Sequence, residues 1–206
     1  MLKIWGRLNS INVMKVMWCV DELGIAHERV DAGMQYGVVG EDFYAKLNPN
    51  RRVPTIEDDG LILWESNVIV RYLCAKYGAG TMSPEDPGER ALADQWMDWQ
   101  QTTVHADITF IFWAVVRDLK ANQDPEKLSA AASRLGESWG VVDAHLADRA
   151  FLCGDQLTMA DIPLGTAAWR WYNMQTERPS LANVEAWHDR LKQRPGFQKY
   201  VMLPLT

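Results

Sequence analysis

The stretch from Asn48 to Ser66, NPNRRVPTIEDDGLILWES, decides the fold of the first half of this chain. Val53 is β-branched and precedes Pro54, so its backbone is pushed toward extended geometry, and an X-Pro bond at such a corner is able to be cis. Asp58-Asp59-Gly60 supplies a hairpin turn, because glycine adopts positive φ without steric cost. The stretch predicts a loop, a strand, a tight turn, a return strand over Leu61 to Trp64, and the start of a helix.

The same stretch has the features of a ligand site. With Pro54 cis, the N–H and C=O of Val53 are free to pair with the backbone of an extended, peptide-like ligand. Ser66 is a good N-cap for a helix from Asn67 to Tyr77, whose first N–H groups attract a carboxylate, while Glu65 attracts an ammonium group. A Glu-Ser pair before a helix is by itself more often only a cap. Together with the hairpin it predicts a site for a ligand that carries all three groups.

The composition limits the classes of function. A chain of 206 residues with 48% hydrophobic residues buries a core in one large or two small domains. The net charge of −6 argues against nucleic acid or an anionic membrane as a partner. No run reaches the length of about 18 apolar residues that a membrane span needs, and Met1 to Ile4 lead straight into strand-like sequence. We expect a cytoplasmic protein.

The cysteines, histidines and tryptophans carry different information. Cysteines 19, 74 and 153 are far apart and odd in number, so we expect them to be reduced and buried. The four histidines are scattered and give no metal-ligand spacing. Seven of the ten tryptophans follow residue 90, which predicts a helical region with broad aromatic surfaces.

The first 77 residues predict a mixed α/β domain. A strand over Leu2 to Arg7 precedes a helix that stops at Gly24. The apolar residues on one face of that helix are Val13, Val16, Met17, Val20 and Leu23. A short strand over His27 to Asp31, a loop over Ala32 to Gly40 and a short helix over Glu41 to Leu47 follow. With the hairpin, the order is β-α-β-α-β-β-α, which is thioredoxin-like.

The rest of the chain predicts helices alone. Gly78 to Gly88, GAGTMSPEDPG, is the expected linker, so that the domains are residues 1–77 and 89–206. Helical spacing runs from Glu89 to about Leu119, and Asp124 caps a helix that begins at Pro125 and ends near Arg149. Ser180 caps a last helix that ends near Gln193.

One further helix start is marked by Thr158 and Asp161, which have capping-box spacing with Asp in place of the usual Glu. Pro163 removes one early hydrogen bond of that helix, so we expect a local distortion and an unbroken fold.

The run Asn48 to Leu73, NPNRRVPTIEDDGLILWESNVIVRYL, resembles the glutathione-binding half of the cytosolic glutathione transferases. Val-Pro and Glu-Ser are separated by a hairpin in the same way, and the resemblance extends over all 206 residues. It is closest in kind to serine-type, bacterial-like members near the theta, phi and beta types. It implies a thioredoxin-like domain followed by an all-helical domain, a homodimer, and a detoxification transferase that uses glutathione as co-substrate against an apolar electrophile.

The resemblance also implies which residue activates glutathione. Ser10-Ile11-Asn12-Val13-Met14-Lys15-Val16 resembles the stretch in which a serine hydrogen-bonds the glutathione sulfur. A hydroxyl donor and an electropositive helix start both stabilise a thiolate and lower its pKa. Two alternatives stay open: Ser10 only caps the helix, or Asn12 is the donor. Cys19 lies well inside the helix, which disfavours cysteine-type chemistry.

The remaining contacts with glutathione follow from the same resemblance. Val53, before a cis Pro54, pairs with the cysteinyl backbone, while Glu65 and Ser66 hold the γ-glutamyl end. The family often has Gly-Lys before Val-Pro, whereas this chain has Arg51-Arg52. Arg52 keeps a cation for the glycyl carboxylate, and Arg51 is expected to be solvated. Gln35 and Tyr36 lie where relatives often place another glycyl-end contact.

The electrophile site is less defined by the sequence. Candidate lining residues from the helical half are Phe112, Trp113, Trp171, Tyr172, His105 and Thr109. Core packing is the commoner role for each aromatic residue taken singly. Other glutathione-dependent activities, such as isomerase, peroxidase or reductive dehalogenase, stay open beside transfer, as does a non-enzymatic ligand carrier.

Overall fold

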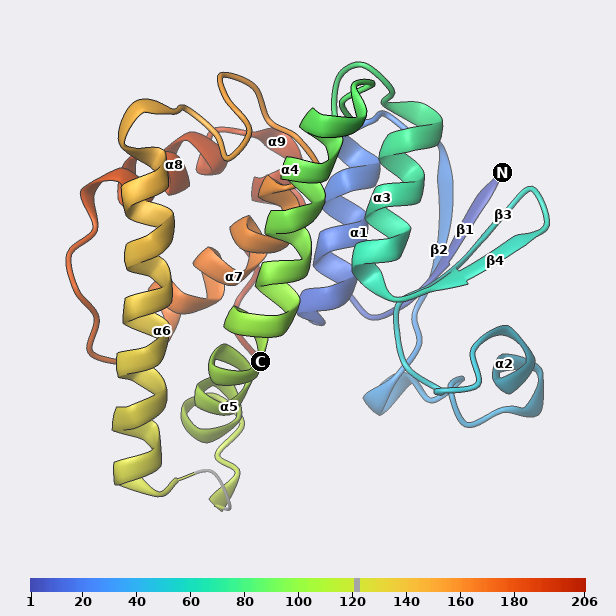
Figure 1. The fold of residues 1–206 in the computed structure, drawn as a ribbon. Helices are drawn as coiled ribbons and strands as arrows, with labels where there is room; N and C mark the ends of the chain where they lie inside the picture. The colour runs from blue at the N-terminus through green and yellow to red at the C-terminus, as the bar shows by residue number, and fades with distance from the viewer. Residues whose placement is uncertain (121–122) are drawn as a thin grey trace.

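The computed structural model describes residues 1–120 and 123–206, and within them four strands form one mixed sheet (Figure 1). The strand order is β2-β1-β3-β4, with β1 parallel to β2 and antiparallel to β3. The strands are β1 (Leu2–Trp5), β2 (His27–Val30), β3 (Thr55–Asp58) and β4 (Leu61–Trp64). The predicted parallel unit and antiparallel hairpin are both confirmed.

Helices cover the two faces of the sheet unequally. Helices α1 (Ile11–Glu22) and α3 (Ser66–Tyr77) lie between the sheet and the helical half of the molecule (Figure 1). Successive side chains of a strand point to opposite faces, so Ile4 joins the large core on this side. Its neighbour Trp5 packs with Tyr44 of the short helix α2 (Asp42–Leu47) on the other side.

Among the described residues from 87 onward, the regular elements are helices. Its longer elements are α4 (Pro87–Trp99), α5 (His105–Val115), α6 (Pro125–His145), α7 (Asp161–Asn173), α8 (Ala182–Lys192) and α9 (Pro195–Tyr200). Asp86 and Asp124 cap α4 and α6, and proline follows each cap at the first helical position. The cap predicted for α6 is therefore confirmed.

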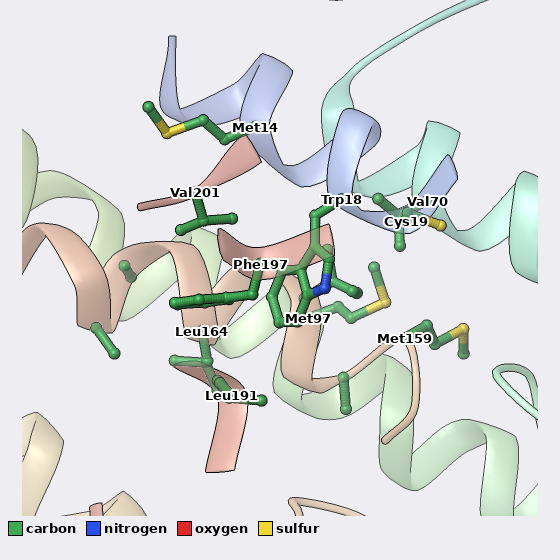
Figure 2. Packing of buried hydrophobic residues seen from close by; sticks show 14 of the residues in the cluster. Met14, Trp18, Cys19, Val70, Met97, Met159, Leu164, Leu191, Phe197 and Val201 are labelled. Carbon is green, nitrogen blue, oxygen red and sulfur yellow. The ribbon is translucent and has the colours of Figure 1, made fainter. Parts of the chain in front are cut away.

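One core joins the two halves of the chain. Figure 2 shows Trp18 of α1 beside Phe197 of α9, whose ring centroids lie 4.9 Å apart, edge to face. Residues of α3, α4, α7 and α8 belong to the same cluster. Gly165 of α7 is needed at this contact, because a Cβ there would lie 2.8 Å from Trp18 and from Leu191. The helical half is thus packed directly onto α1, the helix that starts beside the predicted site.

Asp161 organises the start of α7. It is fully buried, and its carboxylate accepts hydrogen bonds from the N–H groups of Leu152 and Thr158, both at 3.0 Å, and from Trp187 Nε1 at 2.9 Å. The predicted contact between Thr158 and Asp161 exists. Pro163 lies in the first turn without breaking the helix.

Several predicted boundaries are wrong. Ser66 is the first residue of α3, and Glu65 takes the cap position with φ 72°. The helix expected from residue 89 to 119 is divided, because a π-helical turn, η2 (Gln100–Val104), separates α4 from α5. Leu181 takes the cap position of α8 in place of Ser180.

Other differences concern the short elements. The 3-10 turns η1 (Met34–Tyr36) and η4 (Leu146–Asp148) were not predicted, and α6 ends at His145. Arg194 does end α8, but Pro195 then opens α9, because proline suits a first helical turn. All three cysteines are unpaired, although Cys153 is only partly buried.

Candidate functional site

A cavity of about 700 Å³ lies where α1 faces α5. We call it the α1–α5 cavity. It is lined by Arg7, Asn9, Ser10, Ile11, Asn12, Gly33, Met34, Val39, Arg51, Arg52, Val53, His105, Thr109, Phe112, Trp113, Arg117, Leu119 and Arg170. The sheet half supplies the first eleven of these, and helices α5 and α7 with the segment after α5 supply the others.

Ser10 lines the cavity from the start of α1. Its backbone takes the N-cap conformation, with φ −91° and ψ 123°, and its carbonyl accepts the first helical hydrogen bond from Met14 at 2.9 Å. The Ser10 hydroxyl makes no capping hydrogen bond. The alternative that this side chain caps the helix is therefore wrong, and the hydroxyl is available to a ligand.

Asn12 connects the cavity to the start of α3. Its Oδ1 accepts a hydrogen bond of 3.3 Å from Ser66 Oγ. Its side-chain nitrogen has no partner in the part of the chain that the structure describes, and so remains a possible donor beside Ser10. Ser66 is 5% exposed and does not line the cavity itself.

The loop before β3 presents its backbone as predicted. The Val53–Pro54 peptide is cis, and neither the N–H nor the C=O of Val53 bonds to another described residue. Two buried side chains that were not predicted as part of the site fix this loop. Tyr44 Oη donates to the carbonyl of Arg52 at 2.7 Å, and Asn48 Nδ2 donates to the same oxygen at 2.9 Å.

The two arginines of this loop have different roles. Arg51 was expected to be solvated, but its guanidinium donates to the carbonyls of Val39, Gly40 and Glu41. It braces the segment between η1 and α2, and its side chain is exposed as expected. The Arg52 side chain forms no hydrogen bond or ion pair with the described residues, which leaves it free for an anion.

The structure does not bring every predicted residue to the cavity. Gln35 and Tyr36 are exposed in η1, and their neighbour Met34 lines the wall instead. Glu65 is exposed and lies outside the lining with Pro54.

The two aromatic residues predicted on α7 are also elsewhere. Trp171 is 1% exposed and stacks on Trp139, with centroids 5.1 Å apart. Tyr172 stacks on His188. Both predictions for the electrophile site are wrong, because these rings pack between helices.

Helix α5 forms the predicted aromatic wall. His105, Thr109, Phe112 and Trp113 share one helical face and all line the cavity. Burial, together with the nearby charges of Lys15 and Arg170, lowers the pKa of His105 to about 4, so this imidazole is neutral at neutral pH. Trp113 is 47% exposed, which leaves the wall open at one end.

The cationic residues around the site were not predicted. Arg7, Arg117 and Arg170 line the cavity, and Lys15 lies fully buried behind it. Lys15 Nζ donates to Asn67 Oδ1 at 3.1 Å and to Gln100 Oε1 at 3.0 Å. Burial lowers the pKa of Lys15 to about 7. The sequence signal was weak, since these residues are far apart and each fits a solvated surface.

No group of three or more His, Cys, Asp or Glu side chains in the described parts could hold a metal ion. None of the helices that the structure describes is both long and apolar enough to cross a membrane.

The chain matches two family models and full-length relatives. Residues 1–75 match the glutathione S-transferase N-terminal domain, and residues 125–200 match the C-terminal domain. Glutathione S-transferase GstB of Escherichia coli is 34% identical over 208 residues, with 100% of both chains covered. Glutathione S-transferase 3 of Zea mays is 29% identical over 212 residues, covering 97% of this chain and 93% of its own.

A solved structure is similar along the whole chain. The theta class glutathione S-transferase of Xanthomonas axonopodis pv. citri, with glutathione bound, is 44% identical with a TM-score of 0.94. The match covers 100% of this chain and 99% of the other. Together with the cis Val53–Pro54 loop and the hairpin before α3, these matches show that the chain belongs to the glutathione S-transferase family.

Proposed function

We propose that this protein is a glutathione S-transferase in which Ser10 stabilises the glutathione thiolate for attack on an electrophile in the α1–α5 cavity. The observation that carries the proposal is the unbonded Ser10 hydroxyl at the start of α1, in the cavity that Val53 also lines. A hydroxyl and a helix N-terminus both favour an anion over its protonated form, which lowers a thiol pKa.

This position of the sulfur determines where the other parts of glutathione would bind. Val53 offers unpaired backbone groups to the cysteinyl unit, and Arg52 offers an unpaired guanidinium to the glycyl carboxylate. The first N–H groups of α3 and the Ser66 hydroxyl receive the γ-glutamyl carboxylate, and Glu65 receives its ammonium group. In the free protein the Ser66 hydroxyl donates to Asn12 Oδ1, so it would turn from Asn12 to the carboxylate when glutathione binds.

In the reaction, Ser10 donates a hydrogen bond to the sulfur while the thiolate attacks. The new carbon–sulfur bond forms as the leaving group departs with its electron pair, or as an activated double bond takes up the electron pair and then a proton. His105 is neutral at working pH and borders the same space.

Glutathione binding tests the proposed placement. Replacing Ser66 by Ala removes a charge-assisted hydrogen bond of roughly 1.5–3 kcal/mol, so the affinity should fall by about ten- to a hundredfold in titration calorimetry. Ser133→Ala, at an exposed site on α6, is the matched control and should bind like the original protein. An unchanged affinity in Ser66→Ala would remove this residue from the site.

We also propose that residues 1–77 and 89–206 are two domains joined by residues 78–88. Support comes from the element order, since α3 ends at Tyr77 and α4 begins at Pro87, so that the last two residues of this segment already belong to α4. The two family models also match on either side of this segment. The two domains share one core, so we expect them to unfold together.

A cytoplasmic location is proposed from the thiols. Cys19 and Cys74 are fully buried, with sulfurs at a hydrogen-bond distance of 3.5 Å and no disulfide between them. Free thiols at such proximity suit a reducing compartment.

A homodimer is proposed from the side of the molecule that carries β4, α3 and α4. Large apolar side chains there are exposed, namely Leu61, Ile62, Trp64, Val68 and Leu92. Helices α3 and α4 lie next to each other in Figure 1, and Arg71 of α3 pairs with Asp94 and Asp98 of α4. β4 is also a free edge of the sheet. A second copy that covers this side would bury the exposed apolar side chains and shield the free edge of β4.

A further inference from the structure

The α1–α5 cavity is strongly cationic in an acidic protein. The chain has 27 Asp and Glu residues against 21 Lys and Arg, yet the lining contains five arginines and no carboxylate. Arg51 and Arg52 belong to the loop before β3. Arg7, Arg117 and Arg170 come from three other segments and meet on the opposite side, next to α5.

These three arginines have no acidic partner in the described residues. Arg170 is 6% exposed, and its guanidinium lies 3.7 Å from the centroid of the Phe112 ring. The Nε atoms of Arg7 and Arg117 are buried without a hydrogen-bond partner. Burial and the charges of Arg117 and Arg7 lower the pKa of Arg170 to about 9, so it still carries its charge at neutral pH.

Such an arrangement is unfavourable without an anion. A buried charge is costly unless it is paired, and like charges that face one another add to that cost. The planar guanidinium binds carboxylates through two parallel hydrogen bonds, and Phe112 holds that of Arg170 from behind. The three side chains therefore form a preorganised anion site that the protein itself does not fill.

The carboxylates of glutathione are accounted for elsewhere. In the proposed binding mode the γ-glutamyl end meets the start of α3, outside the cavity lining, and the glycyl end meets Arg52, which lines the cavity from the sheet side. The arginines beside α5 face the remaining space, which Phe112 and Trp113 also border.

We propose that the second substrate is a small electrophile that carries a carboxylate, which Arg170 binds together with Arg7 and Arg117. This inference rests on the proposed transferase function. The carboxylate sits on the arginines, the apolar body lies along Phe112 and Trp113, and the reactive carbon faces the sulfur beside Ser10. With an aryl chloride, the thiolate forms the carbon–sulfur bond and chloride leaves with its electron pair, so no other reactant is needed.

A matched pair of substrates tests the proposal. 4-Chloro-3-nitrobenzoate and 4-chloro-3-nitrobenzamide share a ring and a leaving group and differ in charge. Each kcat/KM is divided by the uncatalysed rate constant with glutathione, which removes the difference in intrinsic reactivity. The original protein should favour the acid over the amide by at least about tenfold, since charge-assisted hydrogen bonds are worth roughly 1.5–3 kcal/mol.

Arginine variants test which side chains cause the preference for the acid over the amide. Arg170→Gln should lower the acid-to-amide ratio by about ten- to a hundredfold, and the ratio cancels any effect that is common to both substrates. Arg117→Gln should lower the same ratio. Because Arg117 is partly exposed, this variant still tests the proposal if Arg170→Gln does not fold. Arg134→Gln is the control: it removes the same charge from an exposed residue of α6 that pairs with Asp107, and it should keep the ratio.

The outcomes are separable. A ratio near one in the original protein, or equal ratios in all variants, would overturn the anion site while leaving transfer intact. Loss of glutathione affinity in Arg170→Gln, with the ratio unchanged, would assign the arginines to glutathione and also overturn the proposal. Failure of the proposed transferase function looks different, because neither substrate would react faster than in buffer.

Discussion

The sequence predicted some of the residues that line the cavity and did not predict others. Ser10, Asn12, Val53 and Arg52 were predicted because they belong to a compact motif at fixed positions along the chain. All four line the α1–α5 cavity, whereas their roles toward glutathione stay a proposal. Arg170 was not predicted, because nothing in its local sequence shows that its helix packs against Phe112. Burial and charge pairing across distant segments are properties of the folded chain alone.

Lys15 gives a prediction for pH dependence. Its pKa falls from 10.5 to about 7 on folding, so between these values the unfolded chain binds one proton more than the folded chain. The free energy of unfolding relative to Lys15→Met should therefore be flat below pH 7 and rise above it, by up to about 1.4 kcal/mol per pH unit. Urea unfolding from pH 6 to pH 9 measures this difference.

A control separates this effect from general charge. Lys46→Met removes a lysine that is exposed on α2, and its stability difference should not vary in the same way. Parallel stability curves for the original protein and Lys15→Met across this range would show that Lys15 holds its proton when buried.

Among the elements, strands and helices were predicted better than their ends. The hairpin was clear because Asp59 and Gly60 both take positive φ, which suits Asp-Gly in a tight turn. The division of the helix after residue 99 was not predicted, because the π-helical turn follows from packing and not from helical propensity. There Gln100 is fully buried against Lys15. Ser66 was misplaced by one residue because Glu65 adopts φ 72°, which a non-glycine residue rarely does.

The start of α7 is expected to control stability. Asp161→Ala leaves three N–H donors without their acceptor in a buried place, so the free energy of unfolding should fall by on the order of 3 kcal/mol. Chemical denaturation at neutral pH measures it. Asp155→Ala changes an exposed acid of the preceding loop and should be close to neutral. Equal effects in the two variants would mean that the Asp161 network contributes little.

For the whole molecule, the two-part architecture followed from composition and element order, but the joining of the parts did not. Hydrophobic periodicity assigns a helix an apolar face without saying what that face meets. In the folded chain, α1 packs against the sheet on one side. On its other side, its own residue Trp18 contacts α7 and α9. The cavity exists only because of this packing, which brings α5 opposite Ser10.

The proposed dimer is tested by a charge on the exposed β4, α3 and α4 side. Leu92 is 59% exposed on α4, and Leu92→Glu should shift the protein toward the monomer, because it places a carboxylate in an apolar interface. Light scattering coupled to size-exclusion chromatography gives the mass. Val141→Glu, at a 54% exposed position on α6, should leave the mass unchanged. A monomeric mass for the original protein would refute the dimer.

The central claim is that Ser10 stabilises the thiolate of bound glutathione. The most direct measurement is a pH titration of the bound thiol, followed by the ultraviolet absorbance of the thiolate, in the original protein, Ser10→Ala and Asn12→Ala. We predict that Ser10→Ala raises the thiol pKa by about one unit or more, equal to roughly 1.4 kcal/mol, with a smaller change in Asn12→Ala. A larger shift in Asn12→Ala with Ser10→Ala nearly silent would contradict it.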